Sequence, residues 1–276
     1  MLFFVEDTSG TAPLGTAGRV HVRSLRSSRE KPPWKDLPSS TGSVERQFVR
    51  KVHLGSTLLP FRLLPPVAAV IPHDGTKVLD GTDARLDRYP GLAQWWRAVE
   101  SQWMANRPSD RLALVEQLDY MSKLTRQLPA GSHRVLYTKA GAHLAAARID
   151  DPTVIIDTNL YWGTTTTIAE ARYLTAILNA PVLTELVQPL QARGLFGPRH
   201  FDKYVWKLPI PIYNANIEVH QQLVDLVSQA EQLVADFDLP DSGFQHQRRK
   251  VRDLLAASEV GIAINHRVTT LMTNGA

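Results

Sequence analysis

Hydrophobic and polar positions first alternate over residues 47 to 80. Phe48, Val52 and Leu54 are separated by charged or polar side chains, and a longer apolar run follows them. Alternation with a period of two is typical of strands that bury one face. The pair Asp74-Gly75 favours a tight hairpin turn. The pattern therefore predicts an antiparallel strand meander over residues 47 to 80.

Three later segments predict a second meander. HRVLYTK (133–139), HLAAARID (143–150) and TVIIDTNLYW (153–162) each contain a short apolar run bounded by turn residues. Such runs are typical of strands. The intervening Asp150-Asp151-Pro152 is better explained as a turn than as a pair of catalytic carboxylates.

Helical spacing replaces the alternation between residues 89 and 128. Trp95, Trp96 and Trp103 lie on or near one face of a first helix, and we interpret them as packing residues rather than as stacking platforms for bases. Ser109 suits the N-cap of a second helix. In that helix apolar residues recur at steps of three and four: Leu114, Leu118, Met121, Leu124 and Leu128.

Further helices are predicted from residue 167 onward. Thr167 to Glu170 has the capping-box pattern and opens a helix that ends near Asn179, and Pro181 suits the first turn of another. Apolar residues between 217 and 237 alternate steps of four and three, which is a heptad seam. This seam packs either within its own domain or against a partner. A basic run from His246 to Arg252 starts the last helix.

Together these elements predict an α+β fold in which strand meanders with inserted helices precede a C-terminal helical extension. We expect three parts: an irregular basic arm at residues 1–44, a domain at 45–214 and the helical extension at 215–276. Residues 1 to 60 contain nine Lys and Arg against five Asp and Glu, which accounts for the net charge of +4 of the whole chain. A basic arm on a balanced body indicates either a polyanionic partner or a solvated segment.

Several classes of protein are excluded by what the sequence lacks. There is no cysteine, so disulfides and thiolate metal sites are ruled out, and this fits the cytoplasmic location that we expect. We find neither a signal peptide nor a membrane span, and we expect no metal site. Nucleotide-binding glycine loops and the GxSxG nucleophile elbow are also missing from the sequence.

Four segments occur in an order that is found in a known family. They are a YLxAILN helix (Tyr173 to Asn179), a loop with glycines and a basic cluster (Gly194 to Lys203), a proline-interrupted strand (Leu208 to Pro211) and an amphipathic helix (Ile217 to Phe237). This series resembles the C-terminal target-recognition domain, or specificity domain, of adenine-N6 DNA methyltransferases of restriction–modification systems. The resemblance covers about residues 40 to 240.

The resemblance implies that residues 45–214 form a target-recognition domain that reads double-stranded DNA. Basic side chains would hold the backbone, and glycines would let the chain approach it closely. The residues that it singles out for DNA binding are Arg134, Lys139, Arg193, Gly194, Gly197, Arg199, His200 and Lys203, with Arg248, Arg249 and Lys250 as possible further backbone contacts.

The catalytic half of the family is not represented in this sequence. The Asn/Asp-Pro-Pro-Tyr/Phe motif that holds a flipped adenine is missing, because the run Lys31 to Trp34 lacks the Asn or Asp. The glycine-bearing loop for S-adenosylmethionine is also missing. We therefore expect no catalytic residue and no cofactor in this chain. A methyltransferase domain or subunit would bind S-adenosylmethionine, and the irregular start indicates a piece of a larger protein.

Two alternative functions stay open at this point. In the first, the heptad seam between Val219 and Phe237 docks a partner, and the chain is an assembly module of such a system. In the second, His200 and Asp202 share one face of a strand and serve an unrecognised hydrolase, although no nucleophile is evident beside them.

Overall fold

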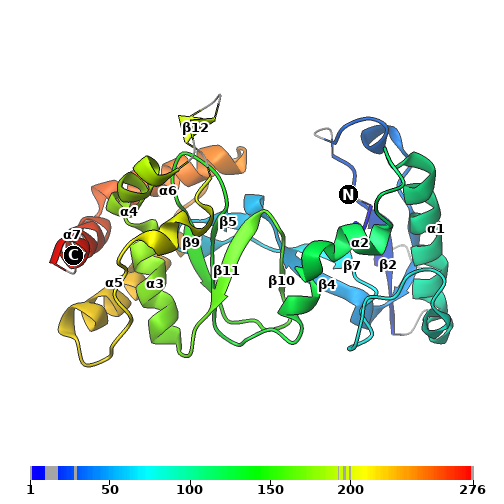
Figure 1. Cartoon of the computed structure of the whole chain (residues 1–276), viewed down its shortest axis with the longest axis horizontal. Helices are drawn as coiled ribbons and strands as arrows, with labels where there is room; N and C mark the ends of the chain where they lie inside the picture. The colour runs from blue at the N-terminus through cyan, green and yellow to red at the C-terminus, as the bar shows by residue number, and fades with distance from the viewer. Residues whose placement is uncertain are drawn as a thin grey trace. The chain divides into compact units, whose positions relative to one another are not determined.

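The computed structural model describes residues 2–9, 18–27, 30–191, 193–194, 197–198 and 200–274. Helices and strands both occur throughout, so the α+β class is confirmed (Figure 1). Contacts divide the chain into two compact units. The first comprises Met1–Val52, Pro66–Ala130 and Thr153–Ile155, and the second comprises His53–Pro65, Gly131–Pro152 and Ile156–Ala276.

A six-stranded sheet in the order β10-β4-β7-β1-β2-β3 forms the centre of the first unit. Its strands are β1 (Phe4–Asp7), β2 (Arg19–Ser24), β3 (Thr41–Glu45), β4 (Val49–His53), β7 (Val67–Val70) and β10 (Ile155–Ile156). The prediction of an irregular arm at 1–44 is wrong for these strands. Val20, Val22 and Val44 are fully buried, and β2 pairs antiparallel with both β1 and β3. These strands were not predicted because their short runs of β-branched residues lie among Ser and Pro residues, which are typical of loops.

The expected meander over residues 47 to 80 is only partly present. The turn at Asp74-Gly75 is confirmed, since Asp74 N donates to Lys77 O and His73 bridges Val78. However, β4 pairs directly with β7. The segment between them leaves the sheet and forms a separate hairpin in the second unit, β5 (Leu58–Leu59) with β6 (Arg62–Leu63).

Helix α1 (Pro90–Asn106) packs on β3 of the first unit. The carboxylate of Glu45 accepts hydrogen bonds from the backbone N–H groups of Gly91 at 3.0 Å and Leu92 at 2.7 Å, which satisfies the first turn of the helix. Trp95 and Trp96 are buried, so their interpretation as packing residues is confirmed.

The long second helix predicted from Ser109 to Leu128 is wrong. Helix α2 covers only Leu114–Leu118, and Met121, which was assigned to its apolar face, is 66% exposed. The side chain of Asp119 accepts hydrogen bonds from Leu124 N and Thr125 N and so competes with the helical pattern. Two short 3₁₀ turns, η6 (Tyr120–Ser122) and η7 (Thr125–Gln127), replace the rest of the helix. Further 3₁₀ turns occur elsewhere in the chain: η2 (Trp34–Asp36), η3 (Arg46–Phe48), η4 (Gly55–Thr57), η5 (Ala84–Arg88) and η8 (Gln188–Leu190).

The second unit contains a three-stranded antiparallel sheet with five helices packed in the same unit. The strands are β8 (Arg134–Thr138), β9 (Ala146–Ile149) and β11 (Leu160–Thr164), in the order β11-β8-β9. The three predicted runs therefore do form strands. Their order is not that of a simple meander, because β11 returns to the free edge of β8.

The helices of this unit are α3 (Ile168–Asn179), α4 (Pro181–Val187), α5 (Glu218–Ala235), α6 (Phe244–Ala257) and α7 (Glu259–Asn274). The predicted start of α3 is confirmed, since Thr167 Oγ1 accepts a hydrogen bond from Glu170 N at 3.1 Å. Arg62 donates to the carbonyl oxygens of Val234 and Phe237 and thereby satisfies the C-terminal end of α5. Glu231 of α5 pairs with Arg148 of β9 and Arg172 of α3.

The heptad seam packs inside the second unit, where α5 contacts α3 and α7. Leu223 and Ala230 of the seam are completely buried, and Leu226, Leu233 and Phe237 are partly buried against the same core. This finding removes the seam as a free surface for a partner helix.

The predicted last helix is two helices. Ser258 separates α6 from α7, and its Oγ accepts a hydrogen bond from Gly261 N at 3.1 Å. A Cβ atom at position 261 would collide with the carbonyl oxygen of Leu255, so the glycine allows the close approach at this bend. The expected strand at Leu208 to Pro211 is also wrong: the segment has no strand partner. Pro209 and Pro211 lack the N–H groups that a strand would need.

Candidate nucleic-acid interface

The end of β8 places one predicted residue over an aromatic ring. Tyr137 of β8 lies opposite Tyr161 of β11, and their rings stack with centroids 5.5 Å apart. Lys139 follows Tyr137 by two positions, and its Nζ lies 5.7 Å from the centre of the Tyr161 ring. This distance is within the range of a cation–π interaction. The strand pairing therefore brings a cation to a stacked aromatic pair in which Tyr137 is buried and Tyr161 is half-buried.

The 3₁₀ segment η9 (Asp202–Lys207) adds a second aromatic group to the same place. Phe201 is buried, and its N–H donates to Lys139 O at 3.0 Å, which attaches the segment to the end of β8. Trp206 Nε1 donates to the hydroxyl of Tyr137 at 3.0 Å, and the two rings meet edge to face. The indole is nevertheless 48% exposed. Its orientation is thus fixed while one part of the ring faces solvent.

A second lysine–tyrosine pair lies on η9. Lys207 Nζ is 4.8 Å from the centre of the Tyr204 ring, and Lys207 is exposed. Among the residues whose side chains are described, neither Lys139 nor Lys207 forms an ion pair with a carboxylate. We call this group the aromatic–basic surface: Lys139, Tyr161, Tyr204, Trp206 and Lys207.

Two cations beside oriented aromatic rings can contact nucleic acid in two ways. The ammonium groups can pair with phosphates, which do not depend on sequence. The rings can pack against sugars and against the edges or faces of bases. The surface therefore has the chemistry of a nucleic-acid interface. Among the described residues, no group of His, Asp and Glu is arranged to hold a metal ion.

The other residues predicted in this region are only partly described. His200 is exposed and bridges Ala140, directly beside Lys139. Arg193, Gly194 and Gly197 contribute backbone to a short ribbon, β12 (Arg193–Gly194) with β13 (Gly197–Pro198). Arg199 and the side chains of Arg193 and Lys203 lie outside the described residues, so their roles stay predictions.

The strand on which His200 and Asp202 were to share a face is not present. His200 forms an isolated bridge, Phe201 has helical backbone angles and Asp202 begins η9. The side chain of Asp202 lies outside the described residues. No described contact supports the catalytic pair.

Arg134 cannot contact DNA in this structure. Its side chain is completely buried, and Nη2 donates to the carbonyl oxygen of Asp151 at 2.8 Å. Burial lowers the pKa of Arg134, and the charge of Asp151 opposes that change. Arg134 occupies the start of β8, where all five residues are buried, so its position in the sheet overrides the surface role that its charge suggested.

The basic run in α6 divides into inward and outward residues. Arg248 donates from Nε to Leu58 O at 2.8 Å and from Nη2 to Gly55 O. Burial lowers its pKa to about 10, and the nearby charge of Arg252 adds to the effect. Arg248 thus fastens α6 to the β5–β6 hairpin, which argues against a phosphate contact. Arg249 and Lys250 are exposed and stay predictions.

Sequence reasoning missed Tyr161, Tyr204, Trp206 and Lys207. The signal for three of them was present, because KYVWK (203–207) interleaves basic and aromatic residues. Tyr161 could be found only from the pairing of β11 with β8, which depends on tertiary structure.

No protein-family model matches the chain, and the search of curated proteins gave no match. Among solved structures, the type IIG restriction endonuclease BpuSI matches with a TM-score of 0.38 and 13% sequence identity. The match covers 100% of this chain and 31% of the BpuSI chain, so this chain spans less than a third of the length of that enzyme. A similarity this weak does not establish a shared fold.

A helix that crosses a bilayer must be both long and apolar. No helix within the described ranges has both the length and the apolar composition needed to span a membrane.

Proposed function

We propose that the chain is a DNA-recognition module and that its aromatic–basic surface contacts the duplex. The observation that carries the proposal is the position of two lysines without a described carboxylate partner: Lys139 lies over the ring of Tyr161, and Lys207 lies over the ring of Tyr204. The exposed ring of Trp206 is held by its hydrogen bond to Tyr137, which stacks on Tyr161. The lysines would form ion pairs with phosphates of the DNA backbone. The oriented ring would pack against the DNA, and this contact depends on the local shape of the duplex.

Residues next to this surface supply the sequence preference in the proposal. His200 lies beside Lys139 through its bridge with Ala140, and Arg193, Arg199 and Lys203 are close to it in sequence. Arginine can donate two hydrogen bonds to the O6 and N7 atoms of guanine and so distinguish this base from others. A lysine that contacts a phosphate does not distinguish between bases. Arg199 is our candidate for a base contact.

The finer part of the proposal is the association with adenine-N6 methylation in a restriction–modification system. Its support is the order of the segments from Tyr173 to Phe237 in the sequence, of which the two helices are present as α3 and α5, whereas Leu208 to Pro211 is not a strand. The catalytic region and its S-adenosylmethionine would belong to another domain or subunit, because the family's catalytic motif is not in this sequence. We expect the purified chain to transfer no label from S-adenosylmethionine to DNA; labelled adenine would contradict this division.

Selection from a random duplex library tests the recognition function. The full chain is mixed with duplexes that carry a random central segment, and the bound fraction is sequenced over successive rounds. We expect one motif to be enriched. In Arg199→Ala, discrimination should weaken at one position of that motif, by about 1–3 kcal/mol for a bidentate base contact.

The control for the selection is Lys123→Met. Lys123 Nζ lies 5.7 Å from the centre of the Tyr120 ring and so repeats the lysine–tyrosine geometry in the first unit, whereas the residues proposed for DNA belong to the second unit. This variant should enrich the same motif as the unaltered chain. Bound pools that remain random in sequence after every round would refute sequence recognition, even if DNA is retained.

A further inference from the structure

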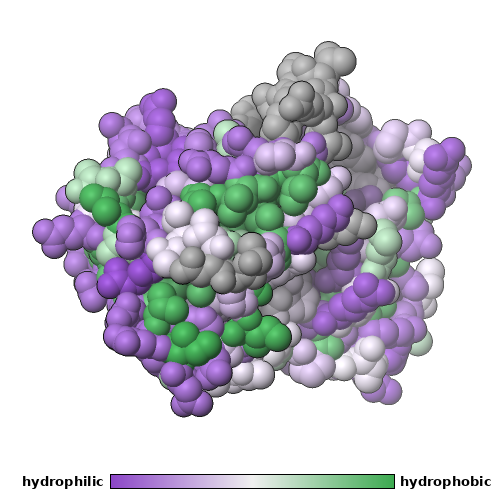
Figure 2. Space-filling view, turned by 60° about the vertical axis from the view of Figure 1, so that its left-hand side comes forward, coloured by the Kyte–Doolittle hydropathy of each residue, from purple (hydrophilic) through white to green (hydrophobic). Residues whose placement is uncertain are grey.

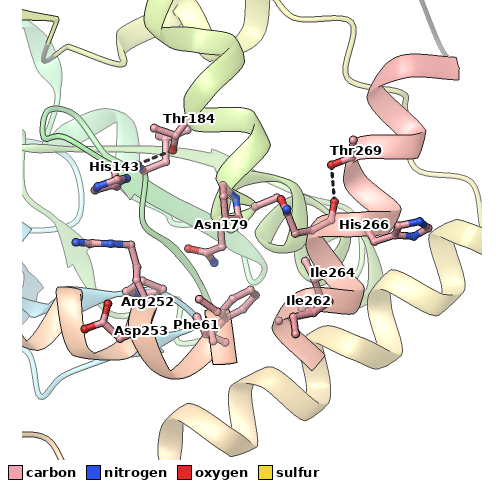
Figure 3. Close-up of a pocket in the computed structure, with 18 of the residues that line it drawn as sticks. Phe61, His143, Asn179, Thr184, Arg252, Asp253, Ile262, Ile264, His266 and Thr269 are labelled. Atoms are coloured by element: carbon pink, nitrogen blue, oxygen red, sulfur yellow. Dashed lines mark hydrogen bonds between the residues drawn. The ribbon is translucent and has the colours of Figure 1, made fainter. Parts of the chain in front are cut away.

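The second unit contains a cavity of about 790 Å³ whose lining includes no residue of the aromatic–basic surface. It lies between the bend that joins α6 to α7, the bend that joins α3 to α4, and the β5–β6 hairpin. This volume is typical of small-molecule sites, which span roughly 300–1,000 Å³. Figure 3 shows the side chains that line it.

The walls of the cavity are held by internal hydrogen bonds. Asn179 accepts from Ala146 N at 2.9 Å and donates to Ala146 O at 2.8 Å, which fixes the end of α3 to β9. Thr184 Oγ1 accepts from Leu144 N, and Asn265 Oδ1 accepts from Val182 N, both at 3.2 Å. Three separate elements are therefore tied together around the space, so the cavity is formed before any ligand enters.

One part of the lining is apolar. Phe61 and Ile264 are almost completely buried, and Ile262 is 57% exposed at the opening. Figure 3 shows these three side chains close together on the α7 side of the cavity. Apolar surface also reaches the outside of this part of the molecule: Figure 2 shows it in patches among hydrophilic surface on the face that includes α5 to α7. A ligand that covers such a wall gains from burial of its own apolar atoms.

The opposite part of the lining is cationic. In Figure 3 the side chain of Arg252 extends from α6 toward His143. Within the described part of the chain, the guanidinium of Arg252 makes no hydrogen bond and no ion pair, although Asp253 is its neighbour in sequence. Among the lining residues that the structure describes, Asp253 is the only one with a carboxylate, and Arg249 and His143 also belong to this set.

Partial burial of Arg252 has an electrostatic cost. It lowers the pKa of Arg252; Asp253 opposes this change, and Arg249 adds to it. Burial also lowers the pKa of His143, and the charge of Arg252 lowers it further. Positive charge is thus held where water is partly excluded, and an anion placed there would relieve the cost.

We propose that this cavity binds a small organic anion, with an apolar ring system against Phe61 and Ile264 and a carboxylate or phosphate group paired with Arg252. The proposal is independent of DNA recognition, because none of the residues of the aromatic–basic surface lines the cavity. Arginine suits both head groups, since its planar guanidinium forms paired hydrogen bonds with either.

A matched pair of fluorescent probes tests the proposal on the full chain. 8-Anilinonaphthalene-1-sulfonate carries an anionic group, and N-phenyl-1-naphthylamine is the same ring system without it. We expect the sulfonate probe to bind at one saturable site. Arg252→Met should weaken its binding by roughly 10-fold or more, because a charge-assisted pair is lost, and should leave the neutral probe almost unchanged.

Two further variants locate the site. Ala256→Phe fills the cavity from an exposed lining position and should weaken both probes. Lys250→Met removes a positive charge from the exposed part of the same helix, outside the lining, and should change neither. Sulfonate-probe affinities that are equal in the unaltered chain, Arg252→Met and Ala256→Phe would overturn the proposal.

Competition identifies the head group. 1-Naphthoic acid and 1-naphthyl phosphate are added to the chain with bound sulfonate probe, and the tighter competitor shows whether carboxylate or phosphate is preferred. Failure of both compounds to displace the probe would also overturn the proposal. DNA is absent from every arm, so these outcomes do not depend on the proposed recognition function.

Discussion

Two kinds of basic side chain in the second unit have opposite environments. One kind is the lysines of the aromatic–basic surface, and the other is the arginines that pack against backbone carbonyl groups. Lys139 and Lys207 lie beside aromatic rings without a described carboxylate partner. Arg134 is completely buried and Arg248 is half-buried, and both donate to backbone carbonyl groups of distant segments. Lys139, Arg134 and Arg248 were identified in the sequence from the same kind of signal, a basic side chain near the end of a regular element.

The difference shows what a basic residue in a sequence can mean. A guanidinium carries several donors in one plane and can satisfy carbonyl groups that would otherwise be buried without a partner. A lysine on the surface offers a single mobile charge to a phosphate. Replacing an arginine that binds backbone carbonyl groups should affect folding, whereas replacing a surface lysine should affect binding.

Replacement of Arg248 should have the largest effect. Arg248→Ala leaves the carbonyl groups of Leu58 and Gly55 without their donor, and we expect the second unit to lose about 4 kcal/mol of unfolding free energy. Urea denaturation followed by far-UV circular dichroism measures this, because α3 to α7 belong to that unit. Lys250→Ala, at an exposed position two residues later, should stay within about 0.5 kcal/mol of the unaltered chain. Equal losses in both variants would show that Arg248 is not a structural contact.

The next effect is a loss of stability in acid through His53. His53 is 5% exposed, and burial, together with the charge of Arg134, lowers its pKa to about 4, whereas Asp151 opposes the change. Between pH 6.5 and 4 the unfolded chain binds a proton at this residue and the folded chain does not, so its stabilising contribution is complete above pH 6.5 and is lost as the pH falls. The total loss at this one site is about 3 kcal/mol.

His53→Asn isolates that contribution. Asparagine can keep the hydrogen bond to Thr57, which His53 makes through Nδ1 at 3.0 Å, but it does not titrate. The unfolding free energies of the two proteins are measured at pH 7 and pH 4. The decrease should be smaller in the variant by about 3 kcal/mol. The same decrease in both proteins would contradict the assignment.

Trp206 should make a smaller contribution, and to binding rather than to folding. Trp206→Ala removes the exposed ring, and we expect duplex affinity to fall by about 2 kcal/mol. Trp206→Phe keeps an aromatic ring but not the donor to Tyr137, so it should retain part of that affinity. Fluorescence anisotropy with a labelled duplex gives both values. An unchanged affinity in Trp206→Ala would remove the ring from the interface.

Local elements were predictable where a side chain and its partner are close in sequence. Thr167 with Glu170, the end of α3 at Asn179 and the turn at Asp74-Gly75 are of this kind. The prediction of α2 failed because Asp119 captures backbone groups five and six residues away. The early strand β1 depends on its partner β7, which is distant in sequence and whose position only the fold supplies.

The candidate surface was predictable only in part for the same reason. Lys139 and His200 were identified from the sequence, and the structure places them side by side. The roles of Arg134 and Arg248 depend on carbonyl groups at Asp151 and Leu58, and no periodicity relates these residues to their partners. Burial decided the outcome, and burial is a property of the packed unit.

The smallest effect per residue is expected for Lys139 and Lys207 of the aromatic–basic surface. The salt dependence of duplex binding measures this effect, and it is also the most direct test of the central claim. Affinity for a labelled duplex is measured by anisotropy over a series of NaCl concentrations for the unaltered chain and for the double variant Lys139→Met/Lys207→Met. Each phosphate contact contributes a slope of about −0.9 to the plot of log K against log salt, so the double variant should lose roughly 2 from the magnitude of the slope. Lys123→Met should keep the slope of the unaltered chain. An unchanged slope in the double variant would contradict the claim that the aromatic–basic surface binds DNA.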